Sequence, residues 1–285
     1  MPLVGKSLQK IEYPLKAILF YCFQPGMRRH WKMRIDDVMN CPDNSLIPRV
    51  HNAGSTNYGF LIMHNGIKII KGSYYGVGMR LLLKCNQGVH EPQEERLFME
   101  VLKYMPEEAV MIELGSYWGF YSMWFQKEVK RASCFLVEPE LRNLEFGREN
   151  FSFSGMKGCF RQGFVGAASG RNENEIPIVC VDDFVIENKI GHINILHADI
   201  QSAEHDMLLG TRKTFESKKV DYVFISTHTN ELHDKCLSFL KDHGFEILAD
   251  ADLNESYSID GIIAARRSDL EGLKPLNISK KRDIA

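Results

Sequence analysis

A glycine-rich turn between a short strand and a helix constrains this chain more than any other feature. Residues 109–122 read AVMIELGSYWGFYS, in which an apolar run ends at Glu113 and is followed by Gly115, Gly119 and a helical pattern. Glycines at such a turn let the backbone approach a nucleotide-like ligand closely. Glu138 ends the next apolar run, where an acidic side chain can accept hydrogen bonds from both ribose hydroxyls. The E-x-G-x-x-x-G spacing differs from the G-x-G-x-x-G of dinucleotide sites and favours S-adenosylmethionine over NAD.

From about residue 107 the hydrophobic pattern alternates between strand and helix, which is typical of an α/β fold with a mostly parallel sheet. The expected strands are 109–114, 133–138, 158–165, 192–199 and 220–226. The expected helices are 90–104, 118–129, 140–150, 203–216 and 230–243. Two further runs, 245–252 and 261–267, are joined by a short polar segment and can pair side by side only as antiparallel neighbours. The sheet is therefore expected to end in an antiparallel hairpin.

The N-terminal part of the chain is expected to lie outside this sheet. Four prolines interrupt residues 1–50, which predicts irregular structure there. Residues 58–71 predict a β-hairpin, because two apolar runs flank Asn65-Gly66, a strong turn signal. The last dozen residues, rich in Lys and Arg, are expected to be loose. The expected division is an N-terminal extension, a main domain and a basic tail: 1–89, 90–270 and 271–285.

Composition excludes some classes of function. The chain has 285 residues and a formal net charge of −2, so no overall positive field favours nucleic acid. Seven scattered cysteines without a C-x-x-C pair indicate reduced thiols, and we expect a cytoplasmic protein. No apolar run approaches the ~20 residues that a membrane span needs.

Residues 15–34 combine an apolar stretch with a basic and aromatic cluster. The apolar run from Ala17 to Phe23 is followed by basic residues from Arg28 to Arg34. Such a segment can make a peripheral contact with an anionic membrane or with a partner. The favoured interpretation is a helix that packs on the main domain and leaves its basic end in solvent.

A second set of polar side chains follows the later strands. The segment ILHADIQSAEHDMLLG ends a strand at Asp199 and continues into a helix that carries Glu204, and the next strand leads to His228. In open α/β sheets, ligands bind beyond the carboxyl ends of the strands. We therefore expect these side chains to face the same crevice as Glu113 and Glu138.

These motifs together resemble the FkbM family of S-adenosylmethionine-dependent methyltransferases, over roughly residues 90–267. The family's glycine turn corresponds to MIELGSYWGFYS in this chain. Its next strand ends in an acidic residue and a proline, here Glu138 and Pro139, with Asn143 shortly after. Residues 1–89 lie outside the resemblance.

The resemblance extends to the later strands, with two departures. The family's K-x-D-x-x-G-x-E element and the polar residue and histidine after the next strand correspond to His197, Asp199, Ser202, Glu204, Thr227 and His228. The usual lysine is thus His197, which alters a charge near the acceptor. The usual glycine is Ser202, which adds a side chain where the backbone comes close.

The resemblance implies a Rossmann-like class I methyltransferase fold with a seven-stranded sheet, and S-adenosyl-L-methionine as cofactor. Asp199 is expected at the boundary between cofactor and acceptor. His228 is the expected general base, with His197 as the second choice, so these three residues form the expected catalytic set. The expected cofactor contacts are Glu113, Gly115, Ser116, Gly119, Tyr121, Ser122, Glu138, Asn143, Gln162 and Asp199.

The implied reaction is O-methylation of a sugar hydroxyl in polysaccharide or glycan synthesis. A polyketide or other secondary metabolite is the alternative acceptor, and an inactive Rossmann-like binding module is the alternative function. An NAD oxidoreductase is disfavoured, because Ser122 stands where a third glycine is needed. A small-molecule or glycan substrate is expected as partner, without nucleic acid, and the oligomeric state is left open. The aromatic residues suited to stacking on a sugar, with at least half of them expected in the core instead, are Tyr74, Tyr75, Trp118, Tyr121 and Trp124.

Two further groups have competing interpretations. Asp199, Glu204, His228 and His197 offer oxygen and nitrogen ligands for a divalent ion, but no metal is predicted. The pair His90 and Glu91 precedes the helix at 90–104, which the resemblance implies lies near the cofactor; capping of that helix is the favoured interpretation of the pair.

Overall fold

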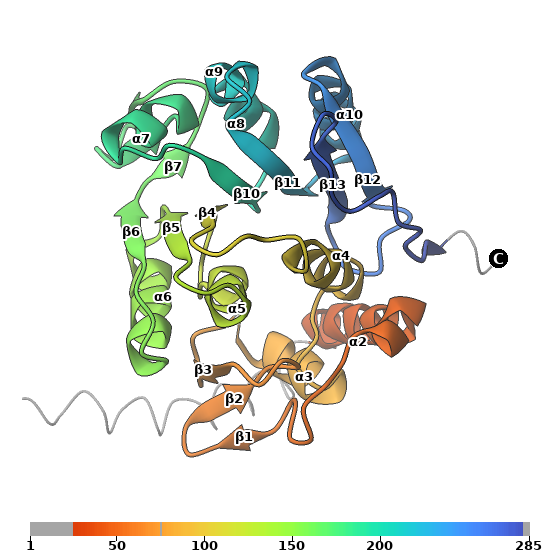
Figure 1. Cartoon of the computed structure of the whole chain (residues 1–285). Helices are drawn as coiled ribbons and strands as arrows, with labels where there is room; N and C mark the ends of the chain where they lie inside the picture. Colours follow the sequence, from red (N-terminus) through yellow and green to blue (C-terminus); the bar gives the residue numbers. More distant parts are fainter. Residues whose placement is uncertain (1–24, 75, 282–285) are drawn as a thin grey trace, which may run out of the picture.

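A seven-stranded sheet forms the centre of the molecule (Figure 1), for which a computed structural model describes residues 25–74 and 76–281. The strand order is β12-β13-β11-β10-β4-β5-β6. The strands from β6 to β11 pair in parallel, and β13 is antiparallel to both of its neighbours. Their bounds are β4 Val110–Leu114, β5 Ser133–Glu138, β6 Cys159–Gln162, β10 Ile193–Ala198, β11 Val220–Thr227, β12 Phe245–Ala251 and β13 Gly261–Arg267. The predicted class I methyltransferase topology is confirmed.

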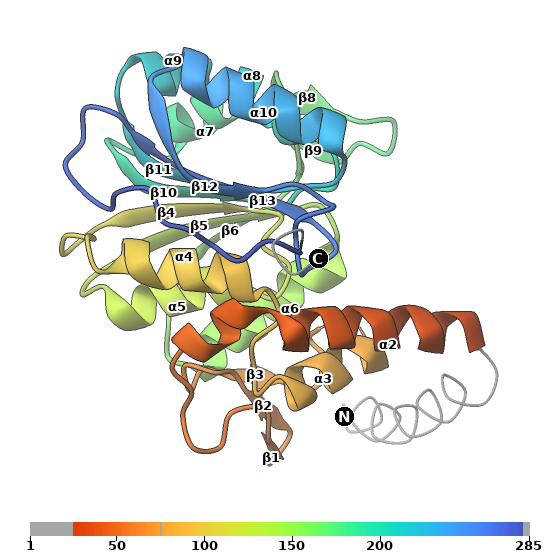
Figure 2. The same ribbon diagram turned by 90° about the vertical axis from the view of Figure 1, so that its right-hand side faces the viewer.

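Helices cover both faces of this sheet (Figure 2). One face carries α4 (Pro92–Leu102), α5 (Phe120–Glu128) and α6 (Leu141–Phe153). The other carries α7 (Val181–Glu187), α8 (Glu204–Leu209), α9 (Arg212–Glu216) and α10 (Asn230–Asp242). Because both faces are covered, β10 and β11 are buried at every position. The ends of the strands are therefore the part of the sheet that is left for a site.

In its described part, the N-terminal extension forms a small sheet and two α-helices. Its elements are α2 Pro25–Asn40, η1 Pro42–Leu46, β1 Thr56–Asn57, β2 Phe60–Ile62, β3 Lys68–Ile70 and α3 Gly76–Cys85. The predicted hairpin is confirmed, since β2 and β3 pair in antiparallel fashion around the Asn65-Gly66 turn. Within that turn, the Asn65 side chain accepts a hydrogen bond from the Ile67 N–H at 3.1 Å.

Within its bounds, helix α2 contradicts the irregular structure expected for residues 1–50. Over residues 25–34 it confirms the helix with an exposed basic end that was favoured for residues 15–34. It begins at Pro25 and continues for 16 residues, ending before Pro42. Proline is tolerated in the first helical turn, because the N–H that it lacks would have no helical partner there. These prolines therefore bound the helix. It packs on α3, where a Cβ at Gly78 would lie 2.1 Å from the Trp31 ring.

The C-terminal segment is packed on the body of the protein. The Ser279 N–H donates to Asp43 Oδ2 at 3.0 Å, and the Ser279 carbonyl accepts from Gln93 Nε2 at 2.7 Å. The Ile278 side chain is buried. The expectation of a loose tail is thus wrong for residues 274–281.

Smaller elements differ from the expectation as well. A second small sheet of order β7-β9-β8 was not predicted; its strands are β7 Phe164–Val165, β8 Gly170–Arg171 and β9 Pro177–Val179. The helix expected over 203–216 is divided at Gly210 into α8 and α9. In the described ranges, no helix is long and apolar enough to cross a bilayer. Some of the expectations above fall on residues outside the described ranges, namely 15–24, Tyr75 and 282–285.

Candidate active site

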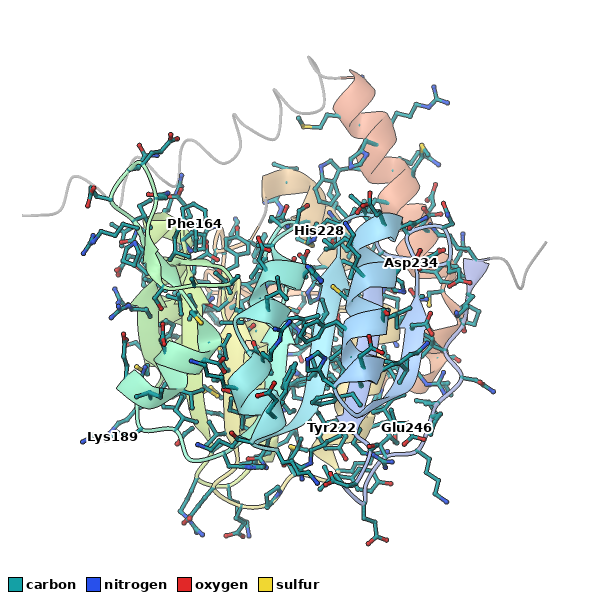
Figure 3. All side chains as sticks on the ribbon, turned by 90° about the horizontal axis from the view of Figure 1, so that it is seen from above. Phe164, Lys189, Tyr222, His228, Asp234 and Glu246 are labelled. Atoms are coloured by element: carbon teal, nitrogen blue, oxygen red, sulfur yellow. The ribbon has the colours of Figure 1, made fainter. Side chains whose placement is uncertain are left out.

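A cavity of about 600 Å³ lies at the carboxyl ends of the parallel strands. It is lined by the segments that follow β4, β5 and β10, and by Trp31 and Arg34 of α2 and Met79 of α3. Figure 3 shows His228 and Phe164 at this edge of the sheet. The volume lies within the range of small-molecule sites. The N-terminal extension thus contributes to the wall of the same cavity as the glycine turn.

The glycine turn is held by a buried carboxylate. Gly115 and Gly119 have φ of +75° and +74°, a conformation that favours glycine. Glu113 Oε2 accepts a hydrogen bond from the Ser122 N–H at 3.0 Å, which ties the end of β4 to the first turn of α5. Burial raises the pKa of Glu113 to about 7, although His197 and the hydrogen bonds from Ser122 oppose the rise. Glu113 therefore orients the turn and also lines the cavity.

Glu138 is fixed at the end of β5 by three donors. Its Oε2 accepts from the Tyr117 N–H at 3.1 Å, and its Oε1 accepts from the Glu140 N–H at 3.0 Å and Asn143 Nδ2 at 3.3 Å. The side chain is buried among protein atoms and still lines the cavity. Burial raises its pKa, and these hydrogen bonds oppose that rise. The arrangement is a carboxylate oriented in advance, with remaining lone pairs for hydroxyl donors.

The structure brings most of the predicted cofactor contacts to this cavity. Those that line it are Glu113, Gly115, Ser116, Tyr121, Glu138, Asn143 and Asp199. Gly119 and Ser122 lie behind the lining and shape the turn. Gln162 is not part of the lining, and its Nε2 donates to the carbonyl of Pro139, which is, at 3.0 Å. Of the aromatic residues, Trp118 and Tyr121 line the cavity, whereas Tyr74 and Trp124 are buried in the core.

His228 is surrounded by carboxylates. Its Nδ1 lies 2.8 Å from Glu204 Oε1, and its Nε2 lies 3.3 Å from Asp199 Oδ1 and 3.5 Å from Asp260 Oδ1. Burial lowers the pKa of His228, but the hydrogen bonds with Asp199 and Glu204 outweigh it and raise the pKa to about 10. Such a histidine is already protonated at neutral pH. It also stands behind Asp199 and Asp260, which line the cavity where His228 does not.

His197 lines the cavity and is paired with a buried carboxylate. Its Nε2 lies 2.6 Å from Glu94 Oε1, and Ser226 Oγ donates to Glu94 Oε2 at 3.1 Å. Burial lowers the pKa of His197, but the hydrogen bond with the Glu94 carboxylate outweighs burial and raises the pKa. The second departure from the family, Ser202, has φ of +79°, so the serine occupies a conformation that glycine adopts more readily.

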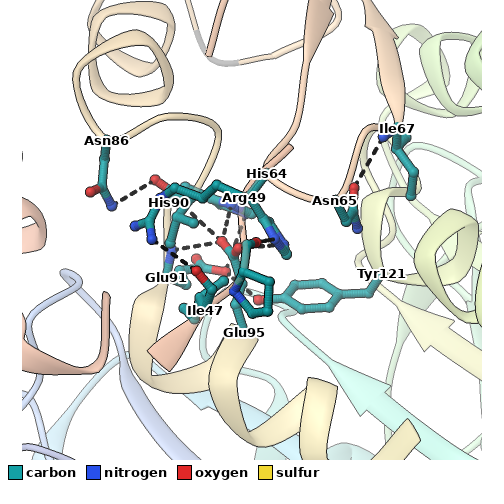
Figure 4. A network of polar contacts seen from close by, with 12 residues as sticks. Ile47, Arg49, His64, Asn65, Ile67, Asn86, His90, Glu91, Glu95 and Tyr121 are labelled. Atoms are coloured by element: carbon teal, nitrogen blue, oxygen red, sulfur yellow. Dashed lines mark hydrogen bonds and ion pairs between the residues drawn. The ribbon is translucent and has the colours of Figure 1, made fainter. Parts of the chain in front are cut away.

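A network that the sequence did not reveal places Glu91 in the cavity (Figure 4). The Tyr121 hydroxyl donates to Glu91 Oε2 at 3.0 Å, and His90 Nε2 lies 3.4 Å from the same oxygen. Behind them, Glu95 lies 2.7 Å from His90 Nδ1 and 3.0 Å from His64 Nε2. Within the described part of the chain, Glu91 Oε1 has no hydrogen-bond partner. Glu91 is thus a carboxylate held at one oxygen, with the other available to a ligand.

The capping interpretation of Glu91 is wrong. Glu91 makes no side-chain hydrogen bond to the start of α4. Glu95 serves that end of the helix instead, since its Oε1 accepts from the N–H groups of His90 at 2.8 Å and Glu91 at 3.1 Å. The sequence did carry a signal for a further role. Glu91, Glu94 and Glu95 stand together at one helix end, and capping that end requires fewer than three carboxylates.

Acidic groups in the cavity have raised pKa values. Burial raises the pKa of Glu91 to about 7, and Glu94, Asp199 and Asp260 add to the rise against the opposing charge of His90. Burial, together with Asp199, raises the pKa of Asp260 to about 6. Groups that titrate near neutral pH in a cavity are candidates for proton transfer.

The sequence comparison decides the family. The model of the "Methyltransferase FkbM domain" matches residues 88–247, more than half of the chain. The chain belongs to the FkbM methyltransferase family. FkbM family methyltransferases depend on S-adenosylmethionine, so this is the cofactor of the protein. No curated protein matches the sequence.

Several solved methyltransferases resemble the FkbM domain in outline. A precorrin-6y C5,15-methyltransferase from Geobacter metallireducens GS-15 is 16% identical, with a TM-score of 0.42 over 61% of this chain and 88% of that one. An S-adenosylmethionine-dependent methyltransferase from Aquifex aeolicus is 14% identical, with a TM-score of 0.40 over 62% and 90%. TrmK from M. capricolum, solved with S-adenosylhomocysteine, is 12% identical, with a TM-score of 0.40 over 66% and 73%. At these scores the family assignment rests on the sequence model.

Proposed function

We propose that this FkbM family methyltransferase is a cytoplasmic O-methyltransferase that acts on a sugar hydroxyl in the synthesis of a glycan or polysaccharide. The observation that carries the proposal is the set of side chains on the wall near the N-terminal extension: Trp31, Arg34, Glu91 and Asp260. The indole of Trp31, with the Arg34 guanidinium 4.9 Å from its ring centre, supplies an apolar surface against which a sugar ring can pack. The carboxylates and the guanidinium supply acceptors and donors for several hydroxyls at once.

The remaining lining residues fit S-adenosylmethionine, whose sulfonium supplies the methyl group. In this proposal Glu138 accepts the ribose hydroxyls, because its two oxygens are already oriented by backbone donors. The turn at Gly115 lies beside the amino-acid part of the cofactor, and Glu113 keeps that turn in place through Ser122. Asp199 stands between the cofactor and the acceptor.

Glu91 is proposed as the base that takes the proton of the acceptor hydroxyl. It lines the cavity, Tyr121 and His90 hold one of its oxygens, and its pKa of about 7 is suited to accepting a proton at neutral pH. His228, the base expected from sequence, is replaced in this role because the surrounding carboxylates keep it protonated.

The charge of the lining favours an uncharged acceptor. In the part of the chain that the structure describes, the basic groups of the lining are Arg34, His90 and His197, and five carboxylates outnumber them: Glu91, Glu113, Glu138, Asp199 and Asp260. Carboxylates accept hydrogen bonds from sugar hydroxyls but repel phosphate and carboxylate groups. A neutral glycoside is therefore a better acceptor in this proposal than a nucleotide sugar.

An acceptor screen with methyl-tritiated S-adenosylmethionine tests the function. The unmodified protein is offered neutral methyl glycosides, nucleotide sugars, and a comparison set of phenols and macrolactones. We expect label in the glycosides, at higher kcat/KM than in the nucleotide sugars. Label in the comparison set alone would overturn the sugar assignment and favour a secondary-metabolite acceptor.

Replacing Glu138 by Ala is expected to weaken S-adenosylmethionine binding by about tenfold or more, or ~1.4 kcal/mol, the scale of a charge-assisted hydrogen bond. Calorimetric titration with S-adenosylmethionine and S-adenosylhomocysteine measures the loss. Glu140→Ala is the matched control. It removes the same charge from an exposed position that lies two residues after Glu138. Equal affinities in the two variants would contradict the ribose role of Glu138.

A further inference from the structure

We propose that the exposed face of α2 docks this protein on an anionic lipid bilayer. The helix has two faces of different character. Trp31, Arg34, Ile35 and Val38 recur at helical spacing and face the body, where Trp31 and Arg34 line the cavity. The opposite face is exposed and carries Met27, Arg28, Arg29, Lys32 and Met33.

The exposed basic groups are available to a partner. Among the described residues, Arg28 and Arg29 have no carboxylate partner, and Lys32 forms one exposed ion pair with Asp36 at 2.7 Å. Figure 2 shows the N-terminal end of α2 extending beyond the rest of the described body. A flat surface can therefore approach this end of the helix.

The charge of the whole chain is segregated toward this segment. Residues 1–34 contain seven Lys and Arg residues and a single acidic residue, Glu12, for a net charge of +6. Because the chain as a whole carries −2, residues 35–285 carry −8. An anionic surface attracts the first segment and repels the remainder, so it selects one orientation of the molecule.

Apolar side chains favour lipid over nucleic acid as the occupant. Met27 and Met33 are 46% and 58% exposed among the basic residues. The sequence immediately before α2 contains the apolar run from Ala17 to Phe23. A basic segment with flexible apolar side chains suits the boundary between headgroups and acyl chains, whereas a purely phosphate-directed surface gains nothing from exposed methionines.

Docking by this face would bring the cavity to the membrane surface. Trp31 and Arg34 lie on the opposite side of the same helix, so only the width of α2 separates the docking face from the wall of the cavity. If the proposed sugar methylation is right, the acceptor is then a glycan presented at the bilayer. The docking itself does not depend on that function.

Sedimentation of the full chain with vesicles tests the proposal. The vesicles are pure phosphatidylcholine or phosphatidylcholine with 30% phosphatidylserine, at about 0.1 M salt, where the Debye length is about 10 Å. We expect binding to the anionic vesicles that falls when the salt is raised to about 0.5 M. Because each basic residue near such a surface contributes ~1 kcal/mol, Arg28→Gln/Arg29→Gln should lower the partition coefficient by about 30-fold.

The control variant removes the same charge elsewhere. Lys189→Gln/Lys213→Gln changes two exposed lysines of the α7–α9 region, and Figure 3 shows Lys189 at the opposite edge of the sheet from His228. It should leave vesicle binding unchanged, and both variants should keep the affinity for S-adenosylhomocysteine, which verifies folding. No binding to anionic vesicles, an equal loss in the two variants, or binding to poly(U) RNA without binding to vesicles would each overturn the proposal.

Discussion

Glu91→Gln is expected to lower kcat by about 10²- to 10⁴-fold, the range that a positioned general base contributes. The amide keeps the shape of the side chain but cannot accept the proton of the acceptor hydroxyl. Tyr121 can still donate to the amide oxygen at this position. We therefore expect S-adenosylmethionine affinity to stay within about threefold, which is under 1 kcal/mol. Single-turnover kinetics with the acceptor found in the screen, together with calorimetry, measure the two quantities.

The pH profile separates a base from a structural residue. A base must be ionised before it accepts a proton, and the pKa of Glu91 is about 7. In the unmodified protein, kcat/KM should therefore fall about tenfold per pH unit below pH 7 and level off above it. Glu91→Gln should lose this acid limb. A retained limb would assign the titration to another group, of which Asp260 is the first candidate.

Two further variants define the role of Glu91. Tyr121→Phe removes the hydrogen bond to Glu91 Oε2 and keeps the ring, so it should lower kcat by about tenfold without removing the acid limb, the scale of one charge-assisted hydrogen bond. Glu140→Gln changes an exposed carboxylate and should have no effect. A tenfold loss of cofactor affinity in Glu91→Gln, with turnover retained, would assign Glu91 to the cofactor's ammonium group instead.

The parts of the fold that were predictable from sequence are those with local signals. The seven strands appear in the sequence as apolar runs, and Gly115 and Gly119 mark the turn after the first of them. Their arrangement as a class I methyltransferase sheet was implied by the resemblance to the FkbM family, and the structure has it. The start of α2 was missed because Pro25 was taken as an interruption. Position within the helix decides whether proline breaks or begins it, and that position is set by packing, here of Trp31 against Gly78.

The chemistry of the site was harder to predict than its location. His228 was placed at the right end of the sheet, but its protonation depends on Asp199, Glu204 and Asp260, and the last of these comes from a segment far from the other two in the chain. Glu91 was assigned to helix capping for the same reason. Its orientation depends on Tyr121, 30 residues later in the chain, and neither hydrophobic period nor motif spacing encodes such a contact.

Gly115→Ala is expected to abolish measurable cofactor binding, with a loss of affinity of at least about 100-fold, or ~2.7 kcal/mol. A Cβ at this position would lie 1.7 Å from the Asp199 carbonyl oxygen and 2.7 Å from its carbon. The two segments cannot easily separate, because the Gly115 N–H donates to the Val137 carbonyl and the Asp199 N–H donates to the Leu114 carbonyl, each at 2.9 Å. The added methyl group must therefore displace backbone that lines the cavity.

Gly155→Ala distinguishes this steric effect from backbone strain alone. Gly155 has φ of +66°, close to the +75° of Gly115, but a Cβ there would have no atom within 4 Å. Both variants carry the cost of a left-handed alanine, about 1–2 kcal/mol, so both should unfold at a lower temperature. Only Gly115→Ala should lose affinity for S-adenosylhomocysteine, measured by calorimetry below the unfolding temperature of each variant. If the two variants bind the ligand equally well, the close approach of Gly115 to Asp199 does not shape the cofactor site.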